Sequence, residues 1–374
     1  MITSILNSGF GHAVRFIAMV ESIRKYSNIP ISCLVSGSMQ KFISLNTSRY
    51  NCQVYNIYYY DSLIKNKIKR HVSSRHKRVL NKLNTTSIMI NDFFINTSNI
   101  RKLFPKDAIT CCLYHGDLNI HEEDDDNIKY FKKSVCHAAS QHDIFFHINI
   151  EQPDFIPNIK CAYIPIPIIT RQVSMDKDAV KKILGLSPSD RFILIHAGSA
   201  VMENVYSNLY EFYTAVNNLK TDYRIVVSNS LENNSFPFRR HIIKAPLFNN
   251  GIDLVNASEL VVSKPGMGIL QDCIAVKKPL LFLPGDFAER NLKISLLNKL
   301  LDNNLPLLKK ISSSELKKCM DECLGIAELY KAAYEKVYTN GADVLAKSME
   351  ILRNAKSHDI NEYIPALYKI TPYH

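Results

Sequence analysis

No apolar run in the sequence approaches the length of a membrane span, so we expect the 374-residue chain to have no transmembrane helix. The opening segment, Met1–Leu6, is too short, and too soon followed by polar residues, to be a secretory signal. The nine cysteines are scattered and form no CxxC pair, which argues against a zinc site and predicts reduced, mostly buried thiols. Together these absences predict a cytoplasmic protein.

Acidic residues are in the minority, since 35 Asp and Glu against 46 Lys and Arg give a formal net charge of +11. The clearest basic block is Ile64–Leu83, whose apolar positions fall roughly on one helical face. We interpret it as an ordinary solvated helix; contact with anionic lipid at the inner membrane face, or with a phosphorylated substrate, is the alternative. No nucleic-acid-binding motif accompanies the charge, so no nucleic-acid partner is expected.

Cofactor-binding fingerprints are also missing. Gly9 and Gly11 fit the start of a dinucleotide motif, but Val14 takes its third small position. The second strand-like run ends at Val35 without the acid that would hold a ribose, and no Gly-Lys-Ser/Thr sequence completes a phosphate-binding loop. The sequence therefore predicts no bound cofactor.

The chain does contain a regular alternation of strand-like and helical segments. The strand-like runs are Ile2–Leu6, Ile31–Val35, Gln53–Tyr59, Ser87–Asn91, Ile109–Leu113, Ile144–Ile148, Phe192–His196, Arg224–Ser228, Leu260–Ser263 and Leu280–Leu283. Such repeated βα units predict an α/β fold of two doubly wound, Rossmann-like domains with parallel sheets, facing a cleft. The alternating prolines of Cys161–Ile169 impose an extended chain and suggest the connector between them.

The expected domains are residues 1–165 and 166–355, with residues 356–374 as a tail that packs back on the first. Carboxyl ends of parallel strands are where such folds bind ligands. The turn "SGFGHAVR" presents His12 at one of them, where an imidazole can take a proton from a hydroxyl; a helix-capping histidine is the alternative. Asp92 ends a later strand and can orient His12 or bind an acceptor, or simply cap a helix. His115 ends the next strand and is a candidate for lining an acceptor site.

A second informative stretch is Asp253–Pro284, in which a strand, a glycine-containing loop, a helix and another strand follow one another. Glycines in the loop Lys264–Gly268 let backbone N–H groups approach an anion at the helix N-terminus, and Lys264 adds a charge suited to phosphate. Asp272, further along that helix, can accept hydrogen bonds from sugar hydroxyls. A further glycine turn, His196–Ala200, belongs to the same domain, and two such turns suit a diphosphate.

This arrangement resembles the two-domain GT-B nucleotide-sugar glycosyltransferases, above all the UDP-N-acetylglucosamine transferase of peptidoglycan synthesis. The stretches that carry the resemblance are the turn Gly9–His12, the segment Leu184–Ser199, the segment Val261–Pro284 and the run "FAERN", Phe287–Asn291. The usual glutamine of the last run is missing, so Glu289 and Asn291 are the nearest matches to residues that contact the donor sugar.

The resemblance implies transfer of a sugar from a nucleoside-diphosphate sugar, most readily a UDP-sugar, to an acceptor hydroxyl or amine without a metal. His12 and Asp92 would be catalytic, while Gly11, Arg15 and His115 would bind the acceptor, and the basic surface favours an anionic or membrane-proximal one. The residues implied in donor binding are Gly198, Ser199, Phe248, Lys264, Pro265, Gly266, Met267, Gly268, Ile269, Asp272, Glu289 and Asn291.

Two alternatives remain open on the same scaffold. One is a nucleotide-sugar hydrolase or epimerase, and the other is a non-catalytic module that binds a nucleotide sugar. The acidic run Glu122–Asp126 contains an Asp-x-Asp sequence, but we interpret it as the acidic N-terminus of a helix because a helix dipole favours acids there. No metal site is therefore predicted.

Overall fold

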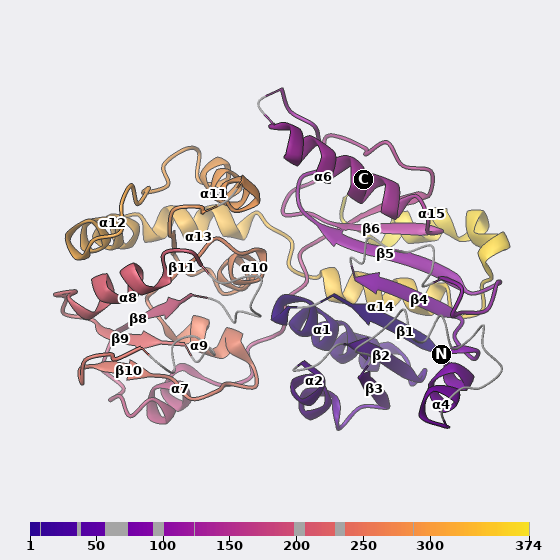
Figure 1. The fold of residues 1–374 in the computed structure, drawn as a ribbon, viewed down its shortest axis with the longest axis horizontal. Helices are drawn as coiled ribbons and strands as arrows, with labels where there is room; N and C mark the ends of the chain where they lie inside the picture. The colour runs from indigo at the N-terminus through magenta and orange to yellow at the C-terminus, as the bar shows by residue number, and fades with distance from the viewer. Residues whose placement is uncertain are drawn as a thin grey trace. The chain divides into compact units, whose positions relative to one another are not determined.

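The computed structural model describes residues 1–7, 9–35, 39–56, 74–92, 101–122, 124–197, 206–228, 236–286 and 288–373. The chain forms two compact units, which are best described one at a time (Figure 1). The first comprises Met1–Thr170 together with Tyr338–His374, and the second comprises Arg171–Val337.

The first unit is built on a parallel sheet of seven strands among the described residues, in the order β3-β2-β1-β4-β5-β6-β7. The strands are β1 (Ile2–Leu6), β2 (Ile31–Val35), β3 (Cys52–Asn56), β4 (Ile88–Asp92), β5 (Ile109–His115), β6 (Ile144–Ile148) and β7 (Ala162–Ile166). Every residue of β1, β2, β4 and β6 is buried, as expected of parallel strands covered by helices on both faces. The alternation seen in the sequence thus predicts six of these seven strands, whereas β7 lies in the segment expected to be a connector.

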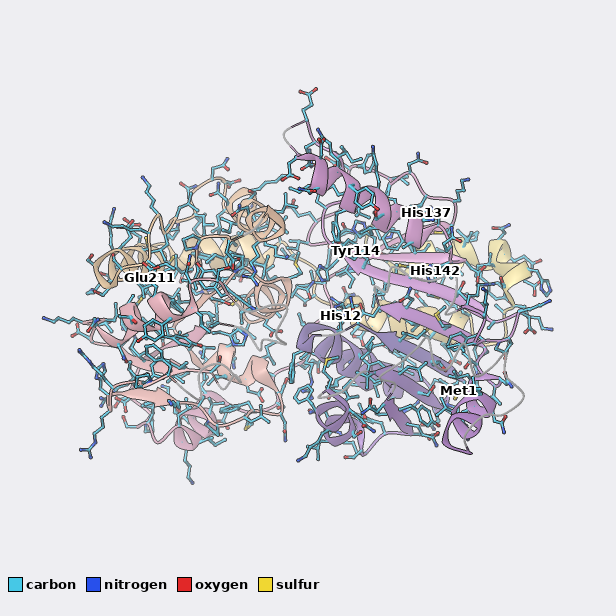
Figure 2. The ribbon with its side chains drawn as sticks, in the orientation of Figure 1. Met1, His12, Tyr114, His137, His142 and Glu211 are labelled. Atoms are coloured by element: carbon cyan, nitrogen blue, oxygen red, sulfur yellow. The ribbon has the colours of Figure 1, made fainter. Side chains whose placement is uncertain are left out.

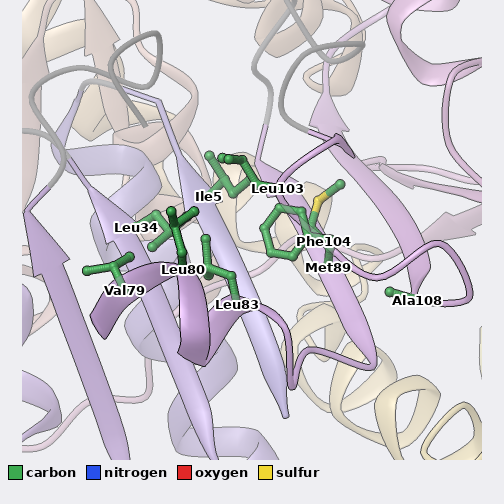
Figure 3. Close-up of a cluster of buried hydrophobic side chains, with 9 residues drawn as sticks. All are labelled: Ile5, Leu34, Val79, Leu80, Leu83, Met89, Leu103, Phe104 and Ala108. Carbon is green, nitrogen blue, oxygen red and sulfur yellow. The ribbon is translucent and has the colours of Figure 1, made fainter. Parts of the chain in front are cut away.

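The helices of this unit come from both ends of the chain. They are α1 (Phe10–Tyr26), α2 (Met39–Thr47), α4 (Ser74–Leu83), α6 (Asp126–Ala139), α14 (Gly341–Ile351), the 3-10 turn η3 (Ser357–Asp359) and α15 (Ile360–Ile370). Helix α4 is the described end of the basic block, and its Val79, Leu80 and Leu83 are buried in a cluster with residues such as Ile5 and Phe104 (Figure 3). This end of the block therefore packs on the sheet through its apolar side, whereas residues 64–73 lie outside the described part.

Helix α14 corrects the expected domain boundary. The sequence assigned residues 338–355 to the second domain, but α14 packs along α1, and Ser22 of α1 donates a hydrogen bond to the Asp343 carboxylate (2.8 Å). The docking is close because a Cβ on Gly341 would lie 2.0 Å from the carbonyl oxygen of Pro167. The chain therefore leaves the first unit after Thr170 and returns to it at Tyr338.

The last residues cover the edge of the first sheet, where β7 has a neighbour on one side only. The segment expected to be a connector forms this edge strand, since Pro165 is tolerated where only part of the backbone pairs. Tyr368 and Thr371 donate hydrogen bonds to the carbonyls of Tyr163 and Pro165 (both 2.5 Å). The tail therefore packs on the first unit and protects its exposed edge.

The second unit repeats the plan with a parallel sheet of five described strands, in the order β10-β9-β8-β11-β12. The strands are β8 (Phe192–His196), β9 (Arg224–Val227), β10 (Ile242–Lys244), β11 (Leu260–Ser263) and β12 (Leu280–Phe282). The helices are α7 (Lys177–Ile183), α8 (Leu209–Asn217), α9 (Gly251–Ala257), α10 (Met267–Val276), α11 (Ala288–Leu300), α12 (Ser313–Gly325) and α13 (Ala327–Glu335). The short strand β10 was not predicted, because only three residues form it.

Within the described residues, no helix combines the length and the apolar character needed to cross a membrane. The same part of the chain contains no cluster of three or more His, Cys, Asp or Glu side chains that could hold a metal ion. The nine cysteines are all free, and six of them are buried.

Candidate functional site

Both sheets reverse their strand order at one place, and the residues of interest lie there. In the first unit the order turns between β1 and β4, and in the second it turns between β8 and β11. Open α/β sheets bind ligands at such switch points, beyond the carboxyl ends of the strands.

The turn after β1 is shaped by one glycine. Gly9 has φ of +131°, a conformation that side-chain-bearing residues rarely adopt, and it directly precedes α1. His12 follows in the first turn of the helix, and Figure 2 shows it at that end of α1. A Cβ on Gly11 would meet no atom within 4 Å, so only Gly9 is required by the backbone. The open space beside Gly11 leaves room for a ligand.

His12 meets two charged side chains at this switch point. Asp92 is the last residue of β4 and lies in register with Leu6, the last residue of β1. The Asp92 carboxylate oxygen Oδ1 lies 3.1 Å from His12 Nδ1. Arg15 donates from Nε to Asp92 Oδ2 (3.1 Å) and from Nη2 to Oδ1 (2.7 Å), which makes a bidentate pair. The structure thus brings His12, Asp92 and Arg15 into one cluster.

Burial differs sharply within this cluster. The side chains of Asp92 and Arg15 are only 2% and 6% exposed, whereas that of His12 is 17% exposed. Burial by itself raises the pKa of Asp92, but the charges and hydrogen bonds of Arg15 and His12 outweigh it and hold that pKa well below its usual range. Asp92 is therefore a carboxylate at neutral pH, and His12 is the member of the cluster that solvent or substrate can reach.

The two ring nitrogens of His12 have different surroundings. Nδ1 lies close to both Asp92 Oδ1 and Arg15 Nη2. No hydrogen bond from the described part of the chain engages Nε2. When Nδ1 carries the proton and donates it to Asp92, the lone pair of Nε2 is available to accept a proton. In the other tautomer Nδ1 accepts a hydrogen bond from Arg15 Nη2 and Nε2 carries the proton, so a general base requires the first tautomer.

Arg15 was predicted to contact an acidic acceptor, and the structure gives its guanidinium another partner. Both oxygens of Asp92 bind it, and Nη2 lies 2.9 Å from His12 Nδ1. With its side chain 6% exposed, Arg15 has little surface to offer a substrate. Its contact with an acceptor stays a prediction.

His115 ends β5, the next strand along the sheet. It is half-buried, and its ring stacks on that of Tyr114 with the ring centroids 5.5 Å apart. Because β5 pairs with β4, His115 lies at the same edge of the sheet as Asp92. Its role in acceptor binding stays a prediction.

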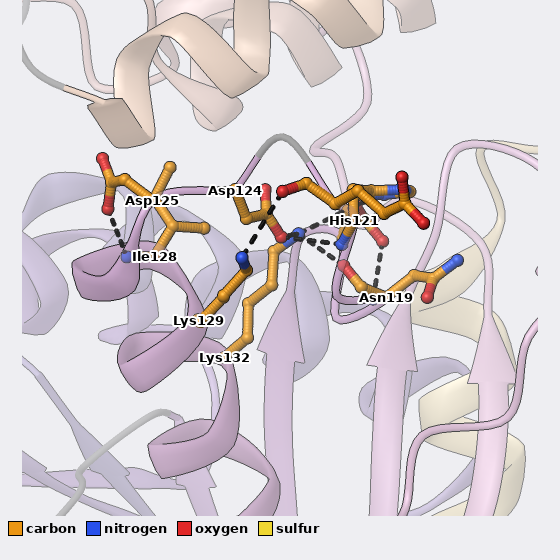
Figure 4. A network of polar contacts seen from close by, with 9 residues as sticks. Asn119, His121, Asp124, Asp125, Ile128, Lys129 and Lys132 are labelled. Carbon is orange, nitrogen blue, oxygen red and sulfur yellow. Dashed lines mark hydrogen bonds and ion pairs between the residues drawn. The ribbon is translucent and has the colours of Figure 1, made fainter.

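The acidic run after β5 is structural. Asp125 caps α6 by accepting a hydrogen bond from the backbone of Ile128 (2.8 Å), as the sequence suggested. Asp124 and Asp117 both pair with Lys132, whose ammonium also donates to the carbonyl of Asn119 (Figure 4). The carboxylates of Asp124 and Asp117 thus satisfy a buried lysine.

At the switch point of the second unit, polar groups gather from three strands. His196 ends β8, and its Nδ1 lies 2.9 Å from the hydroxyl of Ser228, which follows β9. Ser263 ends β11 and donates from its hydroxyl to the carbonyls of His196 (2.6 Å) and Lys264 (2.9 Å). Burial and the neighbouring positive charge of Lys264 lower the pKa of His196 to about 4. His196 is therefore neutral at pH 7.

Helix α10 begins directly after Lys264 and Pro265. Its N-cap is Gly266, and no side chain caps the helix. Neighbouring side chains Met267 and Ile269 are buried, while a Cβ on Gly268 would meet no atom within 4 Å. An uncapped helix N-terminus offers backbone N–H groups and a positive dipole end to an anion. Diphosphate binding at this helix end stays a prediction.

Asp272 lies in the second turn of α10 and is partly buried. Burial raises its pKa to about 7, although the positive charge of Arg171 acts in the opposite direction. Asp272 is thus close to half-ionised at neutral pH. It is the carboxyl group predicted to meet sugar hydroxyls.

Of the remaining residues predicted to bind the donor, the structure describes the side chains of Phe248 and Asn291. Phe248 is half-buried. Asn291 is exposed, and its Oδ1 lies 2.0 Å from where a Cβ on Gly285 would stand, so a side chain at position 285 would have to displace that of Asn291. Gly198, Ser199 and the side chain of Glu289 lie outside the described part of the chain.

Sequence reasoning missed one buried pair beside these residues. Asp286 and Arg290 form a salt bridge (2.5 Å), and the backbone and hydroxyl of Ser207 also donate to Asp286. The pair joins the loop after β12 to the segment before α8. The i,i+4 spacing of the acid and the arginine is a signal that could have found it.

No protein-family model and no curated protein sequence matches the chain. The solved structure of Arabidopsis thaliana UGT89C1 complexed with UDP matches with a TM-score of 0.62 and 11% identity, covering 98% of this chain and 99% of the other. Phytolacca americana UGT2 complexed with UDP-2fluoro-glucose and pterostilbene gives 0.61 and 14%, with 98% and 99% covered. CalG4, the calicheamicin glycosyltransferase, gives 0.59 and 10%, with 98% of both chains covered.

At such low identities the likeness concerns the fold. The chain has the α/β fold with two parallel sheets that GT-B glycosyltransferases share, as the sequence motifs predicted. None of the three structures named is the peptidoglycan enzyme to which the motifs were compared.

Proposed function

We propose that the protein is a glycosyltransferase that moves a sugar from a nucleoside-diphosphate sugar to an acceptor hydroxyl or amine without a metal. The observation that carries the proposal is the pair formed by His12 Nδ1 and the Asp92 carboxylate at the switch point of the first sheet. The fold, shared with glycosyltransferases, supports it. UDP is the proposed nucleotide, because two of the similar structures contain UDP or a UDP-sugar derivative and the sequence resembles a UDP-sugar enzyme.

In this proposal His12 Nε2 accepts the proton of the acceptor hydroxyl. The acceptor oxygen then bonds to the anomeric carbon, and the bond between that carbon and the diphosphate oxygen breaks, so that UDP leaves with the electron pair. Asp92 fixes the ring by accepting a hydrogen bond from Nδ1. General-base catalysis of this kind contributes roughly 10²–10⁴-fold to turnover.

The second unit would bind the donor. Backbone N–H groups in the first turn of α10 and the ammonium of Lys264 would stabilise the charge that develops on the leaving diphosphate. Asp272 would accept hydrogen bonds from the ribose, and Asn291 would contact the sugar. Stabilisation by main-chain dipoles and a lysine supplies the positive charge that a metal ion provides in other transferases.

The acceptor side is proposed at the carboxyl edge of the first sheet. Gly11 and His115 lie at that edge, and the open space beside Gly11 suits an incoming group. We propose an anionic or membrane-proximal acceptor on the basis of the net charge of +11. A cytoplasmic enzyme, associated with the inner membrane face when its acceptor is there, fits this proposal.

The test begins with a thermal-shift screen of UDP, TDP, GDP and their sugars in the presence of EDTA. A ligand at 100 times its Kd stabilises the protein by about 2.7 kcal/mol, which is enough to rank the nucleotides. The preferred sugar nucleotide is then incubated with and without a panel of acceptors. Acceptor-dependent release of UDP supports transfer; equal release without acceptor, or an epimerised sugar, supports the hydrolase or epimerase. Binding without any turnover supports a binding module, and no binding at all contradicts the proposal.

A further inference from the structure

The cluster at the first switch point contains more than a histidine and its carboxylate. Arg15 binds both oxygens of Asp92, and its Nη2 also lies 2.9 Å from His12 Nδ1. Asp92 Oδ1 is therefore shared between the guanidinium at 2.7 Å and the imidazole at 3.1 Å. A carboxylate that served the histidine alone would not need a second, equally buried partner.

We propose that Arg15 is a positioning residue that acts through Asp92 on His12: it binds both oxygens of the carboxylate, offsets its charge and so fixes the side chain that holds the imidazole in place. The inference rests on the proposed role of His12 as the base. It assigns Arg15 to the proton-transfer machinery.

The geometry gives Arg15 two separable effects. Its planar fork holds both carboxylate oxygens and so fixes the direction in which Asp92 Oδ1 faces the ring. Its positive charge, next to Nδ1, disfavours a second positive charge on the imidazole. A histidine beside a lone carboxylate would be stabilised as imidazolium and would be a poor base in mildly acidic solution. The guanidinium removes that bias.

Few other titratable groups reach this cluster among the described residues. Cys33 of β2 and Cys112 of β5 interact electrostatically with Asp92. Burial raises the pKa of both thiols far above neutrality, so both remain uncharged. His115 ends β5 at the same edge of the sheet, while Arg15 and Asp92 are the charged side chains in direct contact with His12 among the described residues.

The direct test is an NMR titration of the His12 imidazole in the full chain, because it needs no turnover. Arg15→Gln should raise the pH at which His12 is half-protonated by about one unit or more, since it removes a positive charge and frees the carboxylate. Asp92→Asn should lower it. The double variant Arg15→Gln/Asp92→Asn removes both buried charges and should titrate close to wild type.

Arg15→Lys separates charge from geometry, because lysine keeps the charge but cannot form the bidentate fork. It should leave the His12 midpoint near that of wild type, yet lower kcat by about tenfold. Arg24→Gln is the matched control: Arg24 lies on the same helix but donates to the carbonyls of Ser27 and Ile29. It should change neither the titration nor kcat.

The double variant and Arg15→Lys avoid an uncompensated buried carboxylate, so they keep the test open if Arg15→Gln fails to fold. If the His12 titration midpoint in Arg15→Gln equals that of wild type, the inference is overturned. It is also overturned if the double variant lowers this midpoint as far as Asp92→Asn alone does.

The pH dependence of kcat/KM distinguishes a failure of this inference from a failure of the proposed function. If the protein transfers sugar, the acid limb of the kcat/KM profile should move to higher pH in Arg15→Gln by the same amount as the NMR midpoint. If the NMR midpoint moves as expected but no sugar nucleotide is turned over, the proposed function fails while the assignment of Arg15 survives. An acid limb that does not move with the midpoint removes His12 as the base.

Discussion

The two switch points occupy equivalent places in their sheets and differ in electrostatic character. In the first unit, a buried arginine and carboxylate cancel each other around a histidine that is the most exposed of the three. In the second unit, His196 is paired with a hydroxyl, and its pKa is lowered to about 4 beside Lys264. Helix α10 adds the positive end of its dipole to Lys264. The first cluster thus pairs an arginine with a carboxylate, whereas the charged side chain described at the second is the lysine Lys264.

This difference indicates a division of chemical labour. A neutral cluster that orients an imidazole is suited to moving a proton, since its net charge does not attract or repel a substrate strongly. A positive cluster at a helix N-terminus is suited to holding an anion. In the proposed function the same topology would supply two sites with different tasks, and substitutions can test each task separately.

The largest expected effect comes from the imidazole of the first cluster. His12→Ala should lower kcat with a UDP-sugar by roughly 10²–10⁴-fold, because it removes the base while leaving the second unit untouched. UDP binding, measured by thermal shift, should remain as in wild type.

His137→Ala is the matched control, since His137 is an exposed histidine of α6 in the same unit (Figure 2). It should leave kcat unchanged. If His12→Ala keeps wild-type turnover at saturating acceptor, the two switch points do not divide the chemistry as proposed.

The next effect belongs to the positive cluster. Lys264→Gln should weaken UDP binding by about 10- to 100-fold, because hydrogen bonds to charged groups contribute roughly 1.5–3 kcal/mol. Lys277→Asn at the other end of α10 is the control, since its left-handed backbone (φ +57°) accepts asparagine. Isothermal titration of UDP against both variants would decide: equal affinities for the two would place the diphosphate elsewhere.

A smaller effect on the free energy of unfolding tests how the first unit is assembled. Gly341→Ala should destabilise the protein by about 1–3 kcal/mol, because the new methyl group would stand 2.0 Å from the carbonyl oxygen of Pro167. Gly325→Ala at the end of α12 meets no atom within 4 Å and should cost far less. Denaturant unfolding of both variants measures the difference; a similar loss in the two would mean that α14 adapts easily.

The sequence predicts most of the fold because the buried strands are continuous apolar runs separated by amphipathic helices. Prediction from the sequence fails for β7 and α14, because their positions depend on packing against distant parts of the chain. The prolines of β7 suggested a linker, yet an edge strand tolerates Pro165 because only one side of its backbone pairs. Helix α14 follows the second unit in sequence but docks on α1, and no local pattern shows that Gly341 meets Pro167 across so long a stretch of chain.

The sequence predicts the candidate site only where its residues lie at the ends of predicted strands. Because His12 follows β1 and Asp92 ends β4, parallel pairing of these strands brings them together. The partner of Arg15 was not predictable, since spacing along α1 gives the direction of its side chain but not which distant acid it meets. The pair of His196 with Ser228 likewise depends on β8 and β9 being neighbours.

The smallest expected effect concerns Asp272 and its pKa of about 7, which burial raises from the usual range. Above pH 7 this group is a carboxylate and accepts hydrogen bonds from ribose hydroxyls better than the neutral acid does. The affinity for a UDP-sugar should therefore rise a few-fold between pH 6 and pH 8, and Asp272→Asn should abolish the rise. His196, with a pKa of about 4, does not titrate in this range.

A UDP-sugar is the right probe because both of its phosphates are esterified on two sides and do not change charge between these pH values, whereas the terminal phosphate of UDP does. The 2′-deoxy analogue sharpens the comparison further. If Asp272 binds the ribose, the analogue should lose the pH dependence in the wild-type protein and be insensitive to Asp272→Asn. A pH dependence that persists in the Asp272→Asn variant would instead arise from another group, and the ribose would then have to be sought away from α10.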